Sequence, residues 1–136
     1  MIELDFEPAL RQELIAIPEV HNRVYPLDAP EATKHNGVPY IIYSSSEGLR
    51  DKTITEGYLS SKEVRGEINV IAEKYSEMKA IAKKVIAILL SFPGRQIGSA
   101  GPYIDDLTYE MPVELYEAQA ALHRCPIEFS VFYKED

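Results

Sequence analysis

The residues with the clearest potential for covalent chemistry are Cys125 and His123, which lie two positions apart near the C-terminal end. An imidazole can take the proton of a neighbouring thiol and leave a nucleophilic thiolate. Residues two apart in an extended segment lie on the same face of a strand, so these side chains can be neighbours. However, no glycine-rich turn exposes the thiol, and no helix N-terminus is expected beside it to lower the thiol pKa. We interpret Cys125 as a half-buried strand residue, and the sequence predicts a non-enzymatic protein without catalytic residues.

The sequence shows no pattern of metal ligands. A structural zinc ion needs four closely spaced ligands, but the chain has one cysteine and three scattered histidines, His21, His35 and His123. The acids at Asp105-Asp106, Glu114 and Glu117 could offer oxygen ligands, but their spacing matches no calcium loop. We interpret them as solvated loop acids and expect no metal.

Motifs that bind phosphate or activate a serine are also not found. Gly94, Gly98 and Gly101 are loosely spaced and lack the Lys-Ser or Lys-Thr pair of a phosphate-binding loop. The serine triplet at 44–46 lacks the flanking glycines of a nucleophile elbow. We interpret the glycines as turn residues and the serines as the end of a strand, and we expect no cofactor.

Composition predicts one globular domain over residues 1–136, because 136 residues that are 46% hydrophobic can bury a core. The 22 acidic and 14 basic side chains give a formal charge of −8, which disfavours binding to a phosphate backbone. The local cluster of Lys79, Lys83 and Lys84 is interpreted as a solvated helix face. The longest apolar run, Val85 to Leu90, is too short to span a membrane, no signal peptide is visible, and we expect synthesis in the cytoplasm.

Two amphipathic helices are predicted. From Asp5 to Ile17, apolar residues recur at three- and four-residue steps, with Asp5 as the expected cap and Pro18 marking the end. The second helix runs from Ser76, also an expected cap, to Leu90, and Phe92-Pro93-Gly94 is expected to stop it. Its apolar stripe consists of Met78, Ile81, Ala82, Val85, Ile86 and Leu89.

Strand patterns occupy residues 23–25, 38–43, 62–72, 104–109 and 121–133. Pro126 is expected to mark a bulge or an edge position in the last of these. Because the strands follow one another in runs, we predict an α+β fold with a mainly antiparallel sheet and two helices packed on one face. The predicted core consists of Leu10, Leu14, Ile42, Ile68, Val70, Ile81, Val85, Leu89, Phe129 and Val131.

A long polar segment, residues 44–61, joins two of these strands. It contains glycine and charges of both signs, and it is far longer than a tight hairpin requires. We predict a long mobile hairpin arm used in binding or assembly, with a plain disordered loop as the alternative. Its candidate assembly residues are Glu47, Arg50, Asp51, Lys52 and Glu56.

The order of several motifs along the chain resembles that of a known family. Arg23-Val24-Tyr25-Pro26 with Ala29-Pro30 is followed by Val38-Pro39-Tyr40-Ile41-Ile42-Tyr43, and then by a strand from Val64 to Ala72 that leads to Tyr75. A helix with an alanine-rich face, a glycine loop, an acidic stretch ending in Tyr116 and the closing strand 127–133 complete the order. Over about residues 7–133, this order is similar to that of the small tail-completion proteins, or tail terminators, of long-tailed phages and prophages.

The resemblance implies a structural subunit that self-associates into a ring, a hexamer in relatives, at the head-proximal end of the tail tube. The implied partners are copies of the chain, the tail tube protein and the head-tail connector protein, with no membrane and no specific nucleic-acid binding. The implied location is the host cytoplasm during assembly and the virion tail afterwards. Two other classes stay open: a head-closure or connector subunit, and a small acidic regulatory protein that binds a soluble host protein.

Overall fold

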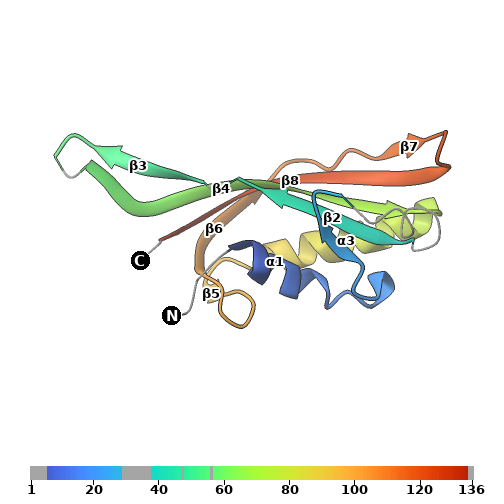
Figure 1. Cartoon of the computed structure of the whole chain (residues 1–136), viewed down its shortest axis with the longest axis horizontal. Helices are drawn as coiled ribbons and strands as arrows, with labels where there is room; N and C mark the ends of the chain where they lie inside the picture. The colour runs from blue at the N-terminus through green and yellow to red at the C-terminus, as the bar shows by residue number, and fades with distance from the viewer. Residues whose placement is uncertain (1–5, 29–37, 47, 56, 135–136) are drawn as a thin grey trace.

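One curved sheet carries two helices on the same face (Figure 1). The computed structural model describes residues 6–28, 38–46, 48–55 and 57–134, with the backbone alone at 49–51, 53 and 58–60. The helices are α1 (Phe6–Leu14) and α3 (Tyr75–Leu90), and the short 3-10 helix η1 (Pro18–Val20) follows α1. The strands are β1 (Val24–Pro26), β2 (Tyr40–Ser45), β3 (Leu49–Thr53), β4 (Gly57–Ala72), β5 (Arg95–Gln96), β6 (Tyr103–Tyr109), β7 (Leu115–Glu117) and β8 (Leu122–Lys134).

The strand order in the described part of the sheet is β1-β2-β4-β8-β6-β5, with β3 added to β4 and β7 added to β8. The β1–β2 pair is parallel, and the other pairs are antiparallel. The predicted α+β fold with a mainly antiparallel sheet and both helices on one face is confirmed.

Strands β4 and β8 form the centre of the molecule, paired continuously from Ser61–Lys134 to Ala72–His123. Alternate residues of both strands face the helices and are buried, as the period of two predicts. The predicted core residues are buried except Ile42, which is half-buried and packs with Tyr40 and Ile71 in a separate small cluster. Ile42 lies on the opposite face of β2 from Ile41 and Tyr43, which explains why it is not in the main core.

Helix α1 ends at Leu14, three residues before the predicted end. The next proline explains the difference: Ile17 precedes Pro18 and is extended (φ −74°, ψ 115°), because the proline ring disfavours helical geometry in the residue before it. Ile17 is nevertheless buried in the main core. The predicted cap Asp5 lies outside the described residues.

Helix α3 begins at Tyr75, and the expected cap at Ser76 is wrong. The residue before the helix is Lys74, which is extended and makes no side-chain capping hydrogen bond, while Ser76 already lies inside the first turn. The predicted apolar stripe is buried apart from Ile86, which is half-buried against the core. The helix ends at Leu90, as predicted, and Gly94 has a positive φ of 83° shortly after it.

Strand β4 has a glycine where the sheet meets α1. A Cβ atom on Gly66 would lie 2.6 Å from Cζ of Phe129 and 2.7 Å from the carbonyl oxygen of Ser44. The Phe129 ring therefore lies over the glycine and contacts the ring of Phe6 on α1, with ring centroids 5.9 Å apart. This close approach lets an aromatic pair fill the space between helix and sheet.

Pro126 lies within β8 in continuous register with β4, so the expected bulge is wrong, but the expected edge position is confirmed on the side of β8 that faces away from β4. Its register with Asn69 on β4 is continuous. On the side of β8 that faces away from β4, the amide of Glu110 donates to the carbonyl of Glu128 (2.9 Å). The backbone groups of Glu128, and of Pro126 two residues before it, therefore point toward β6 and β7. Strand β6 ends at Tyr109 and β7 begins at Leu115, so the missing N–H of the proline faces an unpaired interval and costs no ladder bond.

The glycine loop after α3 packs closely against α1, which the interpretation as simple turn glycines missed. A Cβ atom on Gly101 would lie 2.3 Å from Cβ of Ala9. The amide of Gly98 donates to Oε2 of Glu13 (2.8 Å), and Arg95 binds the same carboxylate at 2.7 and 3.2 Å. The hydrogen bond from Arg95 is the main reason that the pKa of Glu13 is lowered. These contacts attach the loop to the helix.

Candidate assembly surfaces

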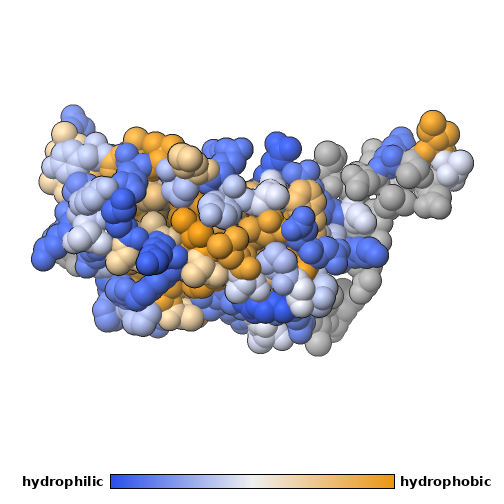
Figure 2. Space-filling model, turned by 180° about the vertical axis from the view of Figure 1, so that it is seen from behind, coloured by the Kyte–Doolittle hydropathy of each residue, from blue (hydrophilic) through white to orange (hydrophobic). Residues whose placement is uncertain are grey.

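The first candidate surface is a two-stranded arm, defined here as residues 48–60, which extends beyond the body of the molecule (Figure 1). Strand β4 has β8 beside it only from Ser61 onward, so Gly57 to Ser60 pair with β3 alone among the described residues. Ile54 at the turn is fully exposed, and Figure 2 shows an apolar group at the far end of the arm. Two-stranded hairpins are marginally stable alone, so this arm depends on the long strand that carries it.

The candidate assembly residues of the segment 44–61 are distributed as follows. Arg50, Asp51 and Lys52 lie on β3, where the pairing with β4 shifts between Arg50 and Lys52. Glu47 and Glu56 lie outside the described residues. Strand β3 was not predicted, because the sequence Leu-Arg-Asp-Lys-Thr has three successive charges and no alternating apolar face.

The second candidate surface is the β6–β7 border, defined here as residues 107–116. Over most of its length β6 has a strand partner on one side only among the described residues, because β5 covers just Tyr103 and Ile104. Large apolar side chains are exposed along it: Met111 (87%), Val113 (57%), Leu115 (46%) and Tyr116 (58%). Figure 2 shows apolar surface along this edge of the body. An unpaired edge with a row of exposed apolar residues is typical of a protein interface.

A cluster of side chains attaches the border to α3. The hydroxyl of Tyr75 donates to Oε2 of Glu114 (2.7 Å), and Nζ of Lys79 is 3.1 Å both from that hydroxyl and from Oε1 of Glu114. His123 lies between the rings of Tyr75 and Tyr116, with centroids 5.7 and 4.9 Å away. We call these five residues the clasp.

The charges of the clasp stabilise one another. Its hydrogen bonds raise the pKa of Lys79 and lower that of Glu114, so both stay charged at neutral pH. A phenol beside a lysine could exchange a proton in catalysis, but this lysine is held as a cation by a carboxylate. The arrangement therefore favours a structural role.

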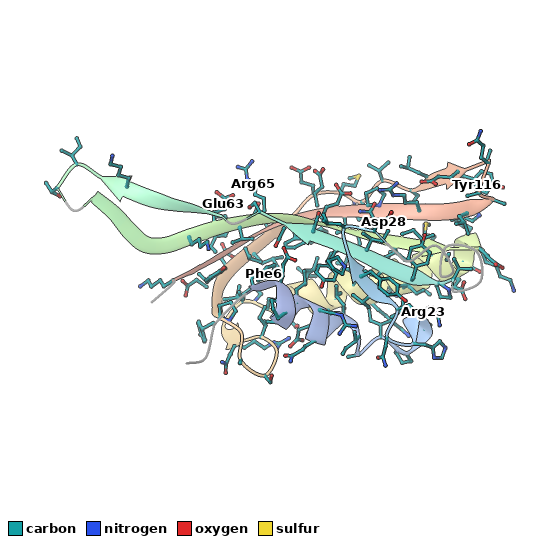
Figure 3. The ribbon with its side chains drawn as sticks, viewed as in Figure 1. Phe6, Arg23, Asp28, Glu63, Arg65 and Tyr116 are labelled. Atoms are coloured by element: carbon teal, nitrogen blue, oxygen red, sulfur yellow. The ribbon has the colours of Figure 1, made fainter. Side chains whose placement is uncertain are left out.

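The third feature is a hollow of about 700 Å³ on the face of the sheet without helices. Figure 3 shows Arg65 on this side of the sheet and Phe6 on the other. The hollow is acidic: its lining residues include Glu63, Glu67, Glu110 and Glu128, with Arg65 3.2 Å from Glu63. The pKa of Glu128 is raised, chiefly by a hydrogen bond with Glu110 and then by repulsion from the same carboxylate.

The hydroxyls at the edge of this hollow have structural partners. The Ser45 hydroxyl donates to Oε2 of Glu7 on α1 (2.7 Å), and Oγ of Ser46 accepts from the amide of Arg65 (3.2 Å). Neither hydroxyl is paired with an imidazole or amine base in these contacts. The serine segment 44–46 was interpreted as the end of a strand, and β2 does end at Ser45.

Cys125 and His123 do not form a nucleophile pair. Cys125 is buried on the helix-facing side of β8, and burial raises the pKa of its thiol. His123 is half-buried and packs within the clasp. A raised thiol pKa leaves less thiolate at neutral pH, which is the opposite of what a nucleophile requires.

The residues that the structure describes contain no group of three or more His, Cys, Asp or Glu side chains that could hold a metal ion. Among them, neither helix is both long and apolar enough to cross a bilayer.

Comparison with known proteins gives matches in structure but not in sequence. No protein-family model and no curated protein matches the chain. A chain in a solved structure described as "Virion of native gene transfer agent (GTA) particle" is 17% identical, with a TM-score of 0.67 over 94% of this chain and 93% of that one. The two chains share a fold. A second solved chain, 16% identical, has a TM-score of 0.54 over 96% of this chain and 92% of that one.

Sequence reasoning missed the clasp and the border. The pair Tyr75 and Lys79, spaced four apart on a helix, was a readable signal for two of the five clasp residues. Glu114 is 39 residues from Tyr75, and nothing in their local sequence connects them. Strand β7 has only three residues and no alternating pattern of burial, which explains why it was not predicted.

Proposed function

We propose that this chain is a non-enzymatic structural subunit of a phage-type particle, which assembles as a ring that caps the head-proximal end of the tail tube and joins it to the head connector. The observation that supports this most strongly is the likeness in fold, over nearly the whole of both chains, to a chain of the gene transfer agent virion. Because one fold can serve many functions, the surfaces of this chain carry the rest of the argument.

The surfaces suit a subunit that works by assembly. The arm extends outside the core, and the β6–β7 border exposes apolar residues beside a strand edge. These are different surfaces, and contacts between different surfaces produce closed rings or filaments. Tyr75, Lys79 and Glu114 of the clasp are held in structural contacts, and Cys125 is buried.

The net charge of −8 is compatible with a ring around a DNA path. An acidic surface does not retain DNA that passes beside it. The acidic hollow on the bare face of the sheet carries such charge. We propose that DNA passes the ring without specific binding.

The experiment that tests the proposal combines native mass spectrometry with negative-stain electron microscopy. Purified protein is incubated with tail tubes assembled from the tube protein encoded by the same genome, and separately with DNA-filled heads that lack tails. The proposal predicts rings, with density at one end of the tubes and tubes of limited length. Binding to heads alone would instead indicate a head-closure or connector subunit. A stable monomer that binds neither particle would contradict the proposal and favour a regulatory binding protein.

A further inference from the structure

The arm and the β6–β7 border have complementary properties, although they lie in different parts of the same molecule. Figure 1 places the arm at one end of the long axis and β7 at the other. Each has a strand edge: β3 pairs with β4 alone, and β6 pairs beyond Ile104 with β8 alone, as far as the strands are described. Strand edges offer backbone donors and acceptors to another chain. The molecule thus carries two pairing edges that cannot meet within one subunit.

The two segments differ in charge. From Tyr103 to Glu117 the sequence contains five acids and no lysine or arginine: Asp105, Asp106, Glu110, Glu114 and Glu117. The arm contains Arg50 and Lys52 against Asp51 and Glu56, so it has no net charge in a chain whose total is −8, and both of its cations lie on β3. Two acidic borders repel each other, whereas the arm brings no net repulsion and two cations to an acidic border.

The apolar residues are also placed for contact. Ile54 at the turn of the arm is fully exposed. Met111 and Val113, in the segment between β6 and β7, are also exposed. Burying such groups is favourable because it removes apolar surface from water. An apolar tip and an apolar border are each unfavourable in water, and each gains by covering the other.

We propose that the arm of one subunit docks along the β6–β7 border of the next copy, with β3 next to the end of β6 and Ile54 near Met111 and Val113. This inference rests on the proposed ring and names the contact that closes it. The contact is head-to-tail, because the donor and the acceptor are different surfaces of one chain. Each subunit then gives one arm and receives one arm.

Two complementary variants test the contact. In the first, residues 51–61 are replaced by Asn-Gly, which joins Arg50 to Lys62, two residues that already face each other across the hairpin. In the second, Val113→Glu places a charge in the border. Leu90→Glu is the matched control, because Leu90 is an equally exposed apolar residue (57%) at the end of α3, away from both surfaces. Circular dichroism and thermal melting establish that each variant is folded.

Each variant alone is expected to lose the ring, with association weakened at least about tenfold, as for an anchor residue of an interface. The control should assemble like the unmodified chain. Ile54→Glu gives a second readout that keeps the whole arm, and it is expected to weaken the ring in the same direction. Rings that persist in the shortened-arm chain and in both glutamate variants would overturn the docking while leaving the proposed function intact.

Mixing the shortened-arm chain with Val113→Glu gives the deciding measurement. The intact arm of the second variant can dock on the intact border of the first, but no further subunit can join. The expected product is a dimer that contains one copy of each variant, detected by native mass spectrometry. If borders instead pair with borders, the shortened-arm chain assembles with itself and takes up none of the second variant, which overturns the proposal. If the unmodified chain forms no ring even on tail tubes, it is the proposed function that fails.

Discussion

Among single residues, Glu128 offers a test that depends on pH. It lies on the bare face of the sheet, where a hydrogen bond with Glu110 raises its pKa and where the charges of Glu110 and Glu67 repel its own. An unfolded chain separates these carboxyl groups, so the pKa of Glu128 returns toward its ordinary value. The folded chain therefore binds a proton at Glu128 more readily than the unfolded chain, and this makes a testable prediction about pH.

Stability should decrease as the pH rises from the ordinary glutamate pKa, about 4.3, through the raised pKa of folded Glu128. Glu128→Gln keeps a hydrogen-bonding group but removes the charge, so it should raise the melting temperature at neutral pH. The gain should shrink in high salt, and it should shrink further as the pH falls below the ordinary glutamate pKa, where Glu128 is protonated in both the folded and the unfolded chain. Thermal melts of both proteins over pH and salt measure this. Glu73→Gln is the charge-matched control, and an equal gain in that variant would assign the effect to net charge.

Cys125 is predicted to be dispensable for assembly and slow to react. Burial lowers access to the thiol and raises its pKa, so alkylation of the folded protein at pH 8 should be much slower than alkylation of the urea-unfolded chain. Cys125→Ser should form normal particles, although a hydroxyl in an apolar site lowers the melting temperature slightly. Loss of assembly in a folded Cys125→Ser protein would revive the nucleophile interpretation. His123→Ala tests the other half of the pair and should also assemble, with looser attachment of β7.

Among the elements, the long strand β4 determines how the molecule is organised. It pairs with β2, β3 and β8 and so belongs both to the core and to the arm. Gly66 lies midway along it, where Phe129 crosses over the backbone. Two predictions concern this strand, one at its centre and one at its end.

Gly66→Ala should destabilise the fold by about 1–3 kcal/mol, the usual cost of extra atoms in a packed site. The new methyl group would be 2.6 Å from the Phe129 ring and 2.7 Å from the backbone oxygen of Ser44, so neither neighbour can accept it without moving. Urea denaturation measures the loss. Arg65→Ala at the adjacent exposed position is the control and should change stability little. An unchanged midpoint for Gly66→Ala would show that the ring of Phe129 can shift freely.

The arm is predicted to be mobile in the free subunit and ordered in the assembled state. Its outer part has one strand partner and an exposed turn, so its backbone hydrogen bonds should open easily. Docking would order it, and the contacts must exceed the lost conformational entropy. Hydrogen exchange on free and assembled protein provides the measurement, with the centre of β8 as a protected reference. Equal exchange of residues 48–60 in both states would contradict the role of the arm in assembly.

The elements also differ in how well the sequence predicts them. Helix α3 and strand β8 can be predicted from the spacing of their apolar residues alone, because one face of each packs on a single continuous core. Strands β5 and β7 have two and three residues, too few for a period to be visible. The arm was predicted from its length but β3 was not, since a charged sequence forms that strand only through its register with β4. The border and the clasp join residues far apart in sequence, and such contacts come from the tertiary fold.

On the scale of the whole molecule, the helices, the acidic hollow and the two candidate assembly surfaces lie in different places. The helices cover one face of the sheet, the acidic hollow lies on the other, and the arm and the border lie at different parts of the rim (Figure 1). A subunit with its contact surfaces on the rim can join neighbours on two sides and keep a face for a central channel or a stacked partner. The clasp adds a link between α3 and the border, so the rim is attached to the core by charged and aromatic contacts.

The continuity of β4 has a mechanical consequence. A pull on the tip of the arm is a pull along the strand, and the hydrogen bonds of an antiparallel ladder lie perpendicular to that direction. The bonds to β2 and β8 are therefore loaded together in shear and must slide together. We expect an arm under tension to detach from its neighbour before β4 slips out of the sheet, so tension around a closed ring would be carried by the strands while each core stays folded.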